Sequence, residues 1–279
     1  MEHLPIPYLL QHIPDTPTQL YIRGTFPNED GYKFLTVIGS RKFTTYGKQV
    51  CEKIIKDLAG YPIVIVSGLA LGIDSLAHRT ALEHNMLTIA VPGSGLDDSV
   101  LYPRTNLGLA KKIIESGGAL ISEFEPHFKA TNWSFPKRNR IMAGMSHAVL
   151  VIEAENTSGT RITARLATDY NREVFAIPGS IFSPSSEGCN ELIREGATPV
   201  TSAEDIINFF NFEKQQPIQS QIVILDPNEE KVINLLNQPL SRNTIAEKLN
   251  MNIINLNILL SSMEIKGVIR EELGKIYKN

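Results

Sequence analysis

Short apolar runs of strand length recur between residues 34 and 200, and each is followed by small or turn-forming residues and then by a helical pattern. The runs are Phe34–Ile38, Ile63–Val66, Thr88–Val91, Ala119–Ile121, Ala148–Ile152 and Val174–Ile177. Continuous runs rich in Val and Ile are typical of strands that are buried on both faces, and their alternation with helices is typical of doubly wound sheets. The pattern therefore predicts an α/β fold built on a doubly wound, mainly parallel sheet.

Turns rich in Gly and Ser follow these strands at their carboxyl ends. They include Gly39-Ser40, Ser67-Gly68, Gly93-Ser94-Gly95, Ser122-Glu123, Ser158-Gly159 and Pro178-Gly179. Crossover connections between parallel strands are right-handed, so the carboxyl ends of the strands lie along one rim of the sheet. We expect the turns to gather there, where open α/β sheets bind their ligands.

The pattern changes after Ser202. A helix over Ala203–Phe210 is expected to close the sheet domain, and the polar stretch Glu213–Gln221 has the composition of a linker. Three short helices and a hairpin then follow in the order of a winged helix, over Glu229–Leu236, Asn243–Leu249, Asn255–Ile265 and Gly267–Tyr277. The predicted parts are a segment packed on the sheet domain (1–33), the sheet domain (34–211), a linker (212–222) and a winged-helix-like domain (223–279).

The charge balance limits the partners that the chain can bind. The 279 residues carry a formal net charge of −3 and a pI near 6.1. Such a balance argues against a polycation that coats duplex DNA, so any nucleic-acid site has to be local. Basic and acidic residues are equally frequent after Gln221, which favours a protein-contact module there over a domain that reads a duplex groove.

Targeting and metal-binding patterns are absent from the sequence. No apolar run has the length of a membrane span, and Met1–Pro5 does not begin a leader, so we expect a cytoplasmic protein without membrane contact. The two cysteines, Cys51 and Cys189, lie far apart, and the six histidines lack metal-ligand spacing. We expect no metal and no cofactor.

A basic cluster follows two aromatic residues in the middle of the chain. Lys137, Arg138 and Arg140 lie within the stretch Phe135–Arg140, and Trp133 precedes them. Cations beside ring faces suit a flexible anionic ligand that carries bases, because phosphates take the charge and bases stack on the rings. The alternative is a solvated basic helix start. Positive charge opposes the dipole at a helix N-terminus, which favours the ligand.

Two rim turns offer further anion contacts. Gly39-Ser40-Arg41 directly follows the first strand, where Gly lets backbone approach a phosphate and Arg supplies a planar fork of donors. Ser158-Gly159-Thr160 opens a helix whose first N–H groups are free to hold an anion, with Arg161 in its first turn. A plain strand-to-helix turn and ordinary Ser/Thr capping remain the alternatives. The usual dinucleotide and ATP glycine fingerprints are absent.

Asp74 and His78 lie four residues apart, so they could pair on one helical turn. As an enzyme site they would be a general base and its orienting partner. No nucleophile accompanies them, which favours a buried structural contact. We interpret Tyr102-Pro103 and Gly188–Ile193 as packing features.

The ordered set of motifs resembles the DprA/Smf family of DNA-processing proteins over nearly the whole chain. The segments that carry the resemblance are Tyr8–Leu10, Leu20–Gly24, Val37–Arg41, Tyr46-Gly47, Ser67–Asp74, Ala77-His78, Gly95–Asp97, Tyr102-Pro103, Ser122–Phe124, Phe135–Ile141, Ser158–Thr160, Ile177–Gly179 and Gly188–Asn190. Two departures stand out. Four residues, 98–101, precede Tyr102 where the family usually has two, and Arg161 replaces an aliphatic residue.

The resemblance implies an extended Rossmann-like fold and a homodimer without a known catalytic reaction. It implies sequence-independent binding of single-stranded DNA, protection of incoming strands, and loading of the RecA recombinase during natural transformation. At matching positions the resemblance implies phosphate contacts by the first turn and the basic cluster, which are Gly39, Ser40, Arg41, Lys137, Arg138 and Arg140. It implies base stacking by Phe135 and hydrogen bonding by Asn139. Ser158, Gly159 and Thr160 complete the rim of the implied site.

Two other functions stay open at this point. One is a nucleotide-processing enzyme similar to the phosphoribohydrolases that share this kind of sheet. The turn Pro92–Asp97 lacks the glutamate that such enzymes place after it, which counts against hydrolysis. The other is a protein-interaction adaptor whose basic rim is incidental.

Overall fold

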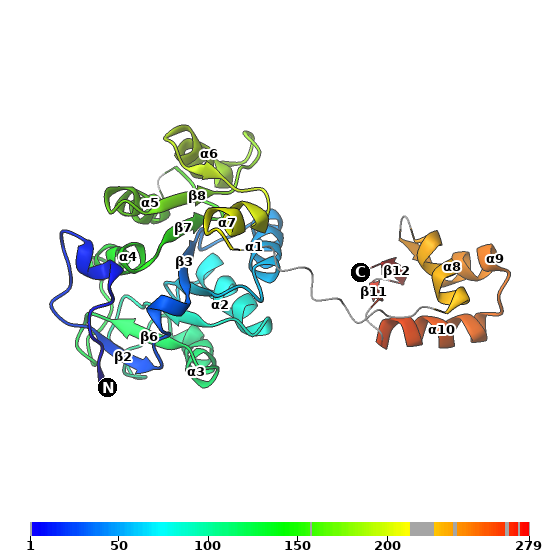
Figure 1. Cartoon of the computed structure of the whole chain (residues 1–279), viewed down its shortest axis with the longest axis horizontal. Helices are drawn as coiled ribbons and strands as arrows, with labels where there is room; N and C mark the ends of the chain where they lie inside the picture. Colours follow the sequence, from blue (N-terminus) through cyan, green and yellow to red (C-terminus); the bar gives the residue numbers. More distant parts are fainter. Residues whose placement is uncertain are drawn as a thin grey trace. The chain divides into compact units, whose positions relative to one another are not determined.

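The computed structural model describes residues 2–156, 158–212, 226–236, 239–265, 268–272 and 274–278. The chain divides into two compact units, Met1–Lys214 and Gln215–Asn279. Figure 1 shows the larger unit as a sheet covered by helices and the smaller unit as helices beside short strands. No helix among the described residues combines the length and the apolar character that crossing a membrane requires.

The larger unit is built on a nine-stranded sheet with the order β1-β2-β6-β5-β4-β3-β7-β8-β9. The strands are β1 (Glu2–His3), β2 (Tyr21–Gly24), β3 (Lys33–Ile38), β4 (Ile63–Ser67), β5 (Thr88–Ala90), β6 (Ala119–Ser122), β7 (Ala148–Val151), β8 (Glu173–Ala176) and β9 (Thr198–Pro199). Strands β3 to β9 are all parallel to their neighbours within that set, whereas β2 is antiparallel to β6 and β1 is antiparallel to β2. The predicted mainly parallel Rossmann-like sheet is confirmed.

Alternate residues of β3 enter separate apolar cores, because successive side chains of a strand point to opposite faces. Phe34 and Ile38 belong to one core and Leu35 and Val37 to the other. Figure 1 shows helices on both sides of the strands. The helices are α1 (Thr45–Asp57), α2 (Ile73–Glu83), α3 (Leu107–Glu115), α4 (Ser134–Met145), α5 (Gly159–Asp169), α6 (Pro184–Arg194) and α7 (Ala203–Phe209), with short 3₁₀ turns at Leu9–His12, Glu29–Gly31 and Arg104–Asn106.

Residues from the N-terminal segment take part in this sheet and pack on one of its helices. Strands β1 and β2 extend the sheet beyond β6. The side chains of Leu10 and Ile13 lie against Gly144 of α4, where an added Cβ would come within 2.7 Å of Leu10 Cδ1. Neither β1, β2 nor β9 was predicted from apolar runs, because all three are short and lie at or near a sheet edge.

The smaller unit has its own core and its own sheet. It contains α8 (Pro227–Leu235), β10 (Leu240–Ser241), α9 (Arg242–Leu249), α10 (Ile253–Ile265), β11 (Ile269–Glu272) and β12 (Lys275–Lys278). The strands form an antiparallel sheet with the order β10-β12-β11. Val232, Ile245, Leu256 and Met263 pack together in the core. The winged-helix-like assignment stays a prediction, and most of the predicted linker lies outside the described residues.

Candidate nucleic-acid interface

A depression of about 660 Å³ lies where the carboxyl end of β3 meets the first turns of α4 and α5. Its lining includes every predicted site residue except Lys137 and Arg140. Those lining residues are Gly39, Ser40, Arg41, Phe135, Arg138, Asn139, Ser158, Gly159 and Thr160. Three segments that are far apart in the sequence therefore contribute to one concave surface. Such a surface at the carboxyl rim is the usual place for a ligand in an open α/β sheet.

The first turn is held by the start of α2. Ser40 Oγ accepts a hydrogen bond from Lys42 N at 3.0 Å and donates to Lys42 O at 2.8 Å, which closes the turn. Gly72 has a φ of 87°, and an added Cβ there would lie 2.2 Å from Ser40 O, so glycine is required on both counts. Arg41 is exposed, and its guanidinium carbon lies 5.7 Å from the centre of the Phe135 ring. The turn thus presents one accessible cation beside an aromatic ring.

The Phe135 ring is held between the backbone of Gly93 and the ring of Tyr102. The ring lies over Gly93, where an added Cβ would approach Phe135 Cδ1 to 2.5 Å. The Ser134 hydroxyl, which is buried, donates to Gly93 O at 2.6 Å and anchors the first turn of α4. The Tyr102 ring lies 5.7 Å from the Phe135 ring, centre to centre, and Tyr102 is 49% exposed. Tyr102, for which the sequence suggested a packing role, therefore widens the aromatic surface.

The start of α5 is tied to the first turn. Ser158 Oγ caps the helix by accepting from Thr160 N at 3.1 Å, and the Thr160 hydroxyl donates to Gly39 O at 3.3 Å. Gly159 has open space around its Cα, so a ligand can approach the backbone there. Arg161 is directed to Asn156 and to Glu195, 2.9 Å away. It therefore pairs within the protein.

Arg138 lies inside the protein with only 5% of its surface exposed. Its guanidinium donates to Gly68 O at 2.5 Å and to Val91 O, and its Nε donates to the Asn139 side chain. Burial lowers its pKa to about 10, which leaves it charged at neutral pH. Backbone carbonyls thus hold the guanidinium through Nη1, and Arg138 still borders the depression. Its predicted phosphate contact stays a prediction.

Arg140 is buried in the same way, on another side of α4. It pairs with Glu123 and donates to Asp15 O, and Tyr170 donates to the Asp15 carboxylate at 2.6 Å. These contacts join α4 to the N-terminal segment. Lys137 is the exposed cation of the cluster, with its Nζ 3.4 Å from Glu123 Oε2. The cluster thus contributes one accessible charge instead of three.

Lys137 and Arg140 line a second depression of about 560 Å³ along α4 and α5. Pro136 and Ile162 border both depressions, so the two are neighbours. The predicted site residues that the first depression leaves out are therefore found in the second.

The model of the family described as DNA recombination-mediator protein A matches residues 2–211. The DNA processing protein DprA of Streptococcus pneumoniae is 44% identical over 208 residues, which are 74% of this chain and 71% of that protein. Protein Smf of Escherichia coli is 42% identical over 198 residues, or 71% of this chain and 52% of that protein.

Solved structures agree. The crystal structure of DprA from Streptococcus pneumoniae superposes with a TM-score of 0.69 at 41% identity, covering 76% of this chain and 75% of that one. DNA processing protein A of Helicobacter pylori, whose structure addresses its single-stranded DNA binding mode, superposes with a TM-score of 0.67 at 32% identity, covering 75% of this chain and 95% of that one. The chain belongs to the DprA/Smf family.

Asp74 and His78 of this DprA/Smf chain have separate partners. The Asp74 carboxylate accepts from Gly68 N at 3.1 Å, and His78 Nδ1 lies 2.7 Å from Thr88 Oγ1. Burial raises the pKa of Asp74, while Arg138 and backbone N–H groups oppose that shift. Burial lowers the pKa of His78 to about 3. The predicted pairing of the two is not what the structure has, and each fixes a different strand end.

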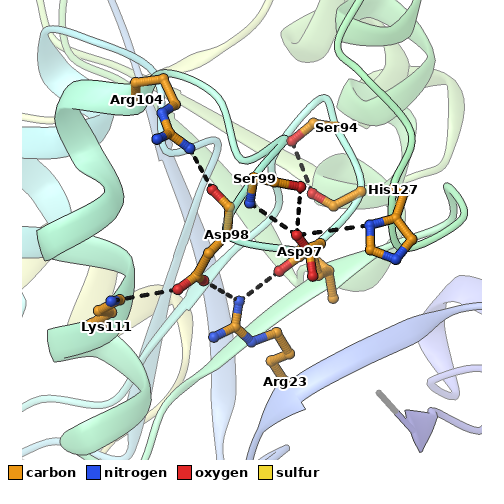
Figure 2. A network of polar contacts seen from close by, with 10 residues as sticks. Arg23, Ser94, Asp97, Asp98, Ser99, Arg104, Lys111 and His127 are labelled. Carbon is orange, nitrogen blue, oxygen red and sulfur yellow. Dashed lines mark hydrogen bonds and ion pairs between the residues drawn. The ribbon is translucent and has the colours of Figure 1, made fainter.

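The loop that carries Tyr102 is held by a polar network, which Figure 2 shows. The Asp98 carboxylate lies 2.6 Å from Nη1 of Arg23 in β2 and 3.4 Å from Nζ of Lys111 in α3. The Asp98 carbonyl accepts a hydrogen bond from Arg104 Nη1 at 2.6 Å. The hydrogen bond from Arg23 holds the pKa of Asp98 below its ordinary value. Residues 98–101, whose number departs from the family pattern, thus include the anchor of this DprA/Smf loop.

No group of three or more His, Cys, Asp or Glu side chains in the described parts of the chain is placed to hold a metal ion. Cys51 and Cys189 are both buried and unpaired. Burial raises the pKa of both thiols, to about 12 for Cys189.

Proposed function

We propose that this DprA/Smf chain binds single-stranded DNA without sequence preference in the depression between β3, α4 and α5. The observation that carries the proposal is the exposed Arg41 beside the Phe135 ring, next to the open backbone of Gly159. Charge, ring and free backbone are together what a single strand needs. The single-stranded DNA binding mode of the Helicobacter pylori relative supports the same ligand class.

Each part of the depression has its own role in the proposal. Arg41, Ser40 and the backbone at the start of α5 hold phosphates, since helix N-termini favour anions. The Phe135 ring with the neighbouring Tyr102 ring receives a base. Asn139 hydrogen-bonds to the strand. Arg138 acts from beneath, as a buried positive charge that neutralises Asp74 and keeps the floor of the depression from being acidic.

Independence of sequence results from the kind of contact. Phosphate contacts are the same for every nucleotide, and every base has a ring face that can stack. Duplex DNA is the less favoured ligand, because its bases are already stacked on each other and its backbone needs a broad positive surface. The chain has a net charge of −3, so its positive surface is local.

Strand binding is the first step of the role that we infer for the chain. It acts as a homodimer in the cytoplasm, protects incoming strands and loads RecA recombinase onto them during natural transformation, without catalysing a reaction. Membership in a family of DNA recombination mediators supports this role. The separate burial of Asp74 and His78 also favours binding over catalysis, since neither group reaches the other.

A salt titration tests the binding site. Single-stranded and duplex oligonucleotides are compared by fluorescence anisotropy over a range of salt concentrations. We expect the single strand to bind more tightly, with a log–log slope of about −0.7 per phosphate neutralised. Arg41→Ala should weaken binding and flatten the slope, whereas Arg194→Ala, which removes an exposed arginine of α6, should do neither. Equal affinities and slopes for Arg41→Ala and the unaltered protein would reject the site.

A further inference from the structure

Trp133 lies at the start of α4 and leaves 55% of its surface exposed, although it belongs to an aromatic cluster. Its ring packs edge-on against Phe124 and Phe128, at 5.7 and 5.5 Å between ring centres. Phe124 and Phe128 stack on each other at 4.5 Å. The indole thus packs against both phenylalanines, while more than half of the surface of Trp133 stays exposed.

A cation accompanies the cluster. Lys137 Nζ lies 5.5 Å from the centre of the Phe124 ring and 5.8 Å from that of Trp133. Lys137 is also the exposed cation of the basic stretch, and its 3.4 Å ion pair with Glu123 is partly in solvent on the lysine side. Arg140 also pairs with Glu123, so an incoming phosphate can bind the ammonium group without leaving that carboxylate unpaired. A ring and an available positive charge therefore lie side by side.

The first turn of α4 consequently carries two separate aromatic surfaces. Phe135 contacts Gly93, Arg41 and Tyr102, whereas Trp133 contacts the Phe124 cluster and Lys137. The rim depression and the depression that Lys137 lines share Pro136 and Ile162 as borders. Lys137 lines the second depression, and its Nζ lies 5.8 Å from the centre of the indole, so the neighbouring depression connects the two aromatic surfaces.

We propose that Trp133 and Lys137 form a second stacking platform, which binds one further base and its phosphate beyond the rim depression. The proposal rests on the function proposed above, because it extends the same strand. The ligand of the exposed aromatic cluster is therefore single-stranded nucleic acid. The platform lengthens the bound segment and adds affinity only for oligonucleotides long enough to reach it.

The composition of the chain supplies a direct probe. Trp133 is the one tryptophan among the 279 residues, so intrinsic tryptophan fluorescence reports on the platform alone. Oligothymidylates of increasing length are titrated into the unaltered protein, and indole emission is followed together with the anisotropy of an end-labelled strand. Short oligomers should raise the anisotropy without quenching the indole. Longer oligomers should do both, since a base stacked on an indole quenches its emission.

Variants separate stacking from packing. Trp133→Ala should weaken the binding of long oligomers by about 5- to 150-fold, the range expected for one stacked base, and leave the binding of short ones unchanged. Trp133→Phe keeps a ring on the Phe124 cluster and should restore most of the affinity. Phe182→Ala, which removes another strongly exposed aromatic residue, is the matched control and should have no effect.

The outcomes distinguish the two proposals. Binding of long strands without quenching, or with equal affinity for Trp133→Ala and the unaltered protein, would overturn the platform and leave the rim site standing. A loss of short and long strands alike in Trp133→Ala would also overturn it, because the residue would then support the rim site itself. Failure of all single strands to bind at low salt would reject both.

Discussion

Asp74 and Arg138 meet at the backbone of Gly68. The Asp74 carboxylate accepts from Gly68 N at 3.1 Å, while the Arg138 guanidinium donates to Gly68 O at 2.5 Å. Both side chains are buried and have little contact with solvent, so each depends on the opposite charge of the other. The end of β4 is thereby joined to α2 and α4 directly beneath the proposed DNA site.

Removing Arg138 should therefore destabilise the fold. We expect Arg138→Met, which keeps much of the aliphatic volume, to lower the free energy of unfolding by about 3–5 kcal/mol, because Asp74 is left buried without its positively charged neighbour. Lys137→Met is the matched control on the neighbouring residue. It should lower the free energy of unfolding by less than about 1 kcal/mol, because Lys137 is exposed and Arg140 still pairs with Glu123. Urea denaturation measures both. Similar midpoints for the two variants would contradict the role assigned to Arg138.

Enlarging Gly93 should impair DNA binding through Phe135. In Gly93→Ala the new methyl group would lie 2.5 Å from Phe135 Cδ1, so the ring has to leave its present position beside Arg41 and Tyr102. We expect a loss of about tenfold in single-strand affinity, the scale of one stacked base. Gly108→Ala on α3 meets nothing within 4 Å and serves as the control. Anisotropy titrations compare the two, and equal affinities would place the bases elsewhere.

Stability should fall as the pH drops from about 6.5 towards 3, because burial lowers the pKa of His78 to about 3 whereas the unfolded chain binds that proton near pH 6.5. The unfolded state then holds more protons, at up to about 1.4 kcal/mol per pH unit for this group. His147, whose pKa burial lowers to about 4, adds to the same trend. Above pH 6.5 these two histidines no longer make stability depend on pH, because they are neutral in both the folded and the unfolded state.

His78→Asn isolates that proton, because its amide can still donate to Thr88 where His78 Nδ1 does so. Between pH 6 and pH 3, the free energy of unfolding of this variant should depend less steeply on pH than that of the unaltered protein. The difference in slope should correspond to the binding of about one proton. Urea titrations at several pH values provide the comparison. Parallel pH profiles would show that His78 is protonated as readily in the folded protein as in the unfolded chain.

Loosening the loop before Tyr102 should raise local mobility without unfolding the domain. Asp98→Ala removes the contacts to Arg23 and Lys111, and partly exposed pairs of this kind contribute about 1 kcal/mol or less. We expect faster hydrogen exchange at the Leu101 amide, which donates to Asp97 O at 3.0 Å. Asp57→Ala, which removes an exposed ion pair with Lys53, is the control. Unchanged exchange at Leu101 would mean that the network does not hold this loop.

The buried strands could be predicted because burial on both faces imposes a continuous apolar run, as in Ile63–Ser67. Short edge strands carry no such signal. Tyr21–Gly24 joins the sheet only because Tyr21 pairs with Ser122 about a hundred residues away, and Thr198 pairs with Phe175. Pairing at an edge depends on what the rest of the chain brings alongside.

The fold class, the carboxyl rim and the family could all be read from the amino-acid sequence alone, since they depend on periodic burial and on an ordered set of motifs. Which cations are accessible became clear only in the folded chain. Arg138 shares a helix face with Ile141, Met142 and Met145, and all four are buried. The charge of Arg138 made that face look solvent-exposed in the sequence. Its burial depends on Asp74 and Gly68, which the fold brings to it from another strand and helix, and a local pattern holds no record of such partners.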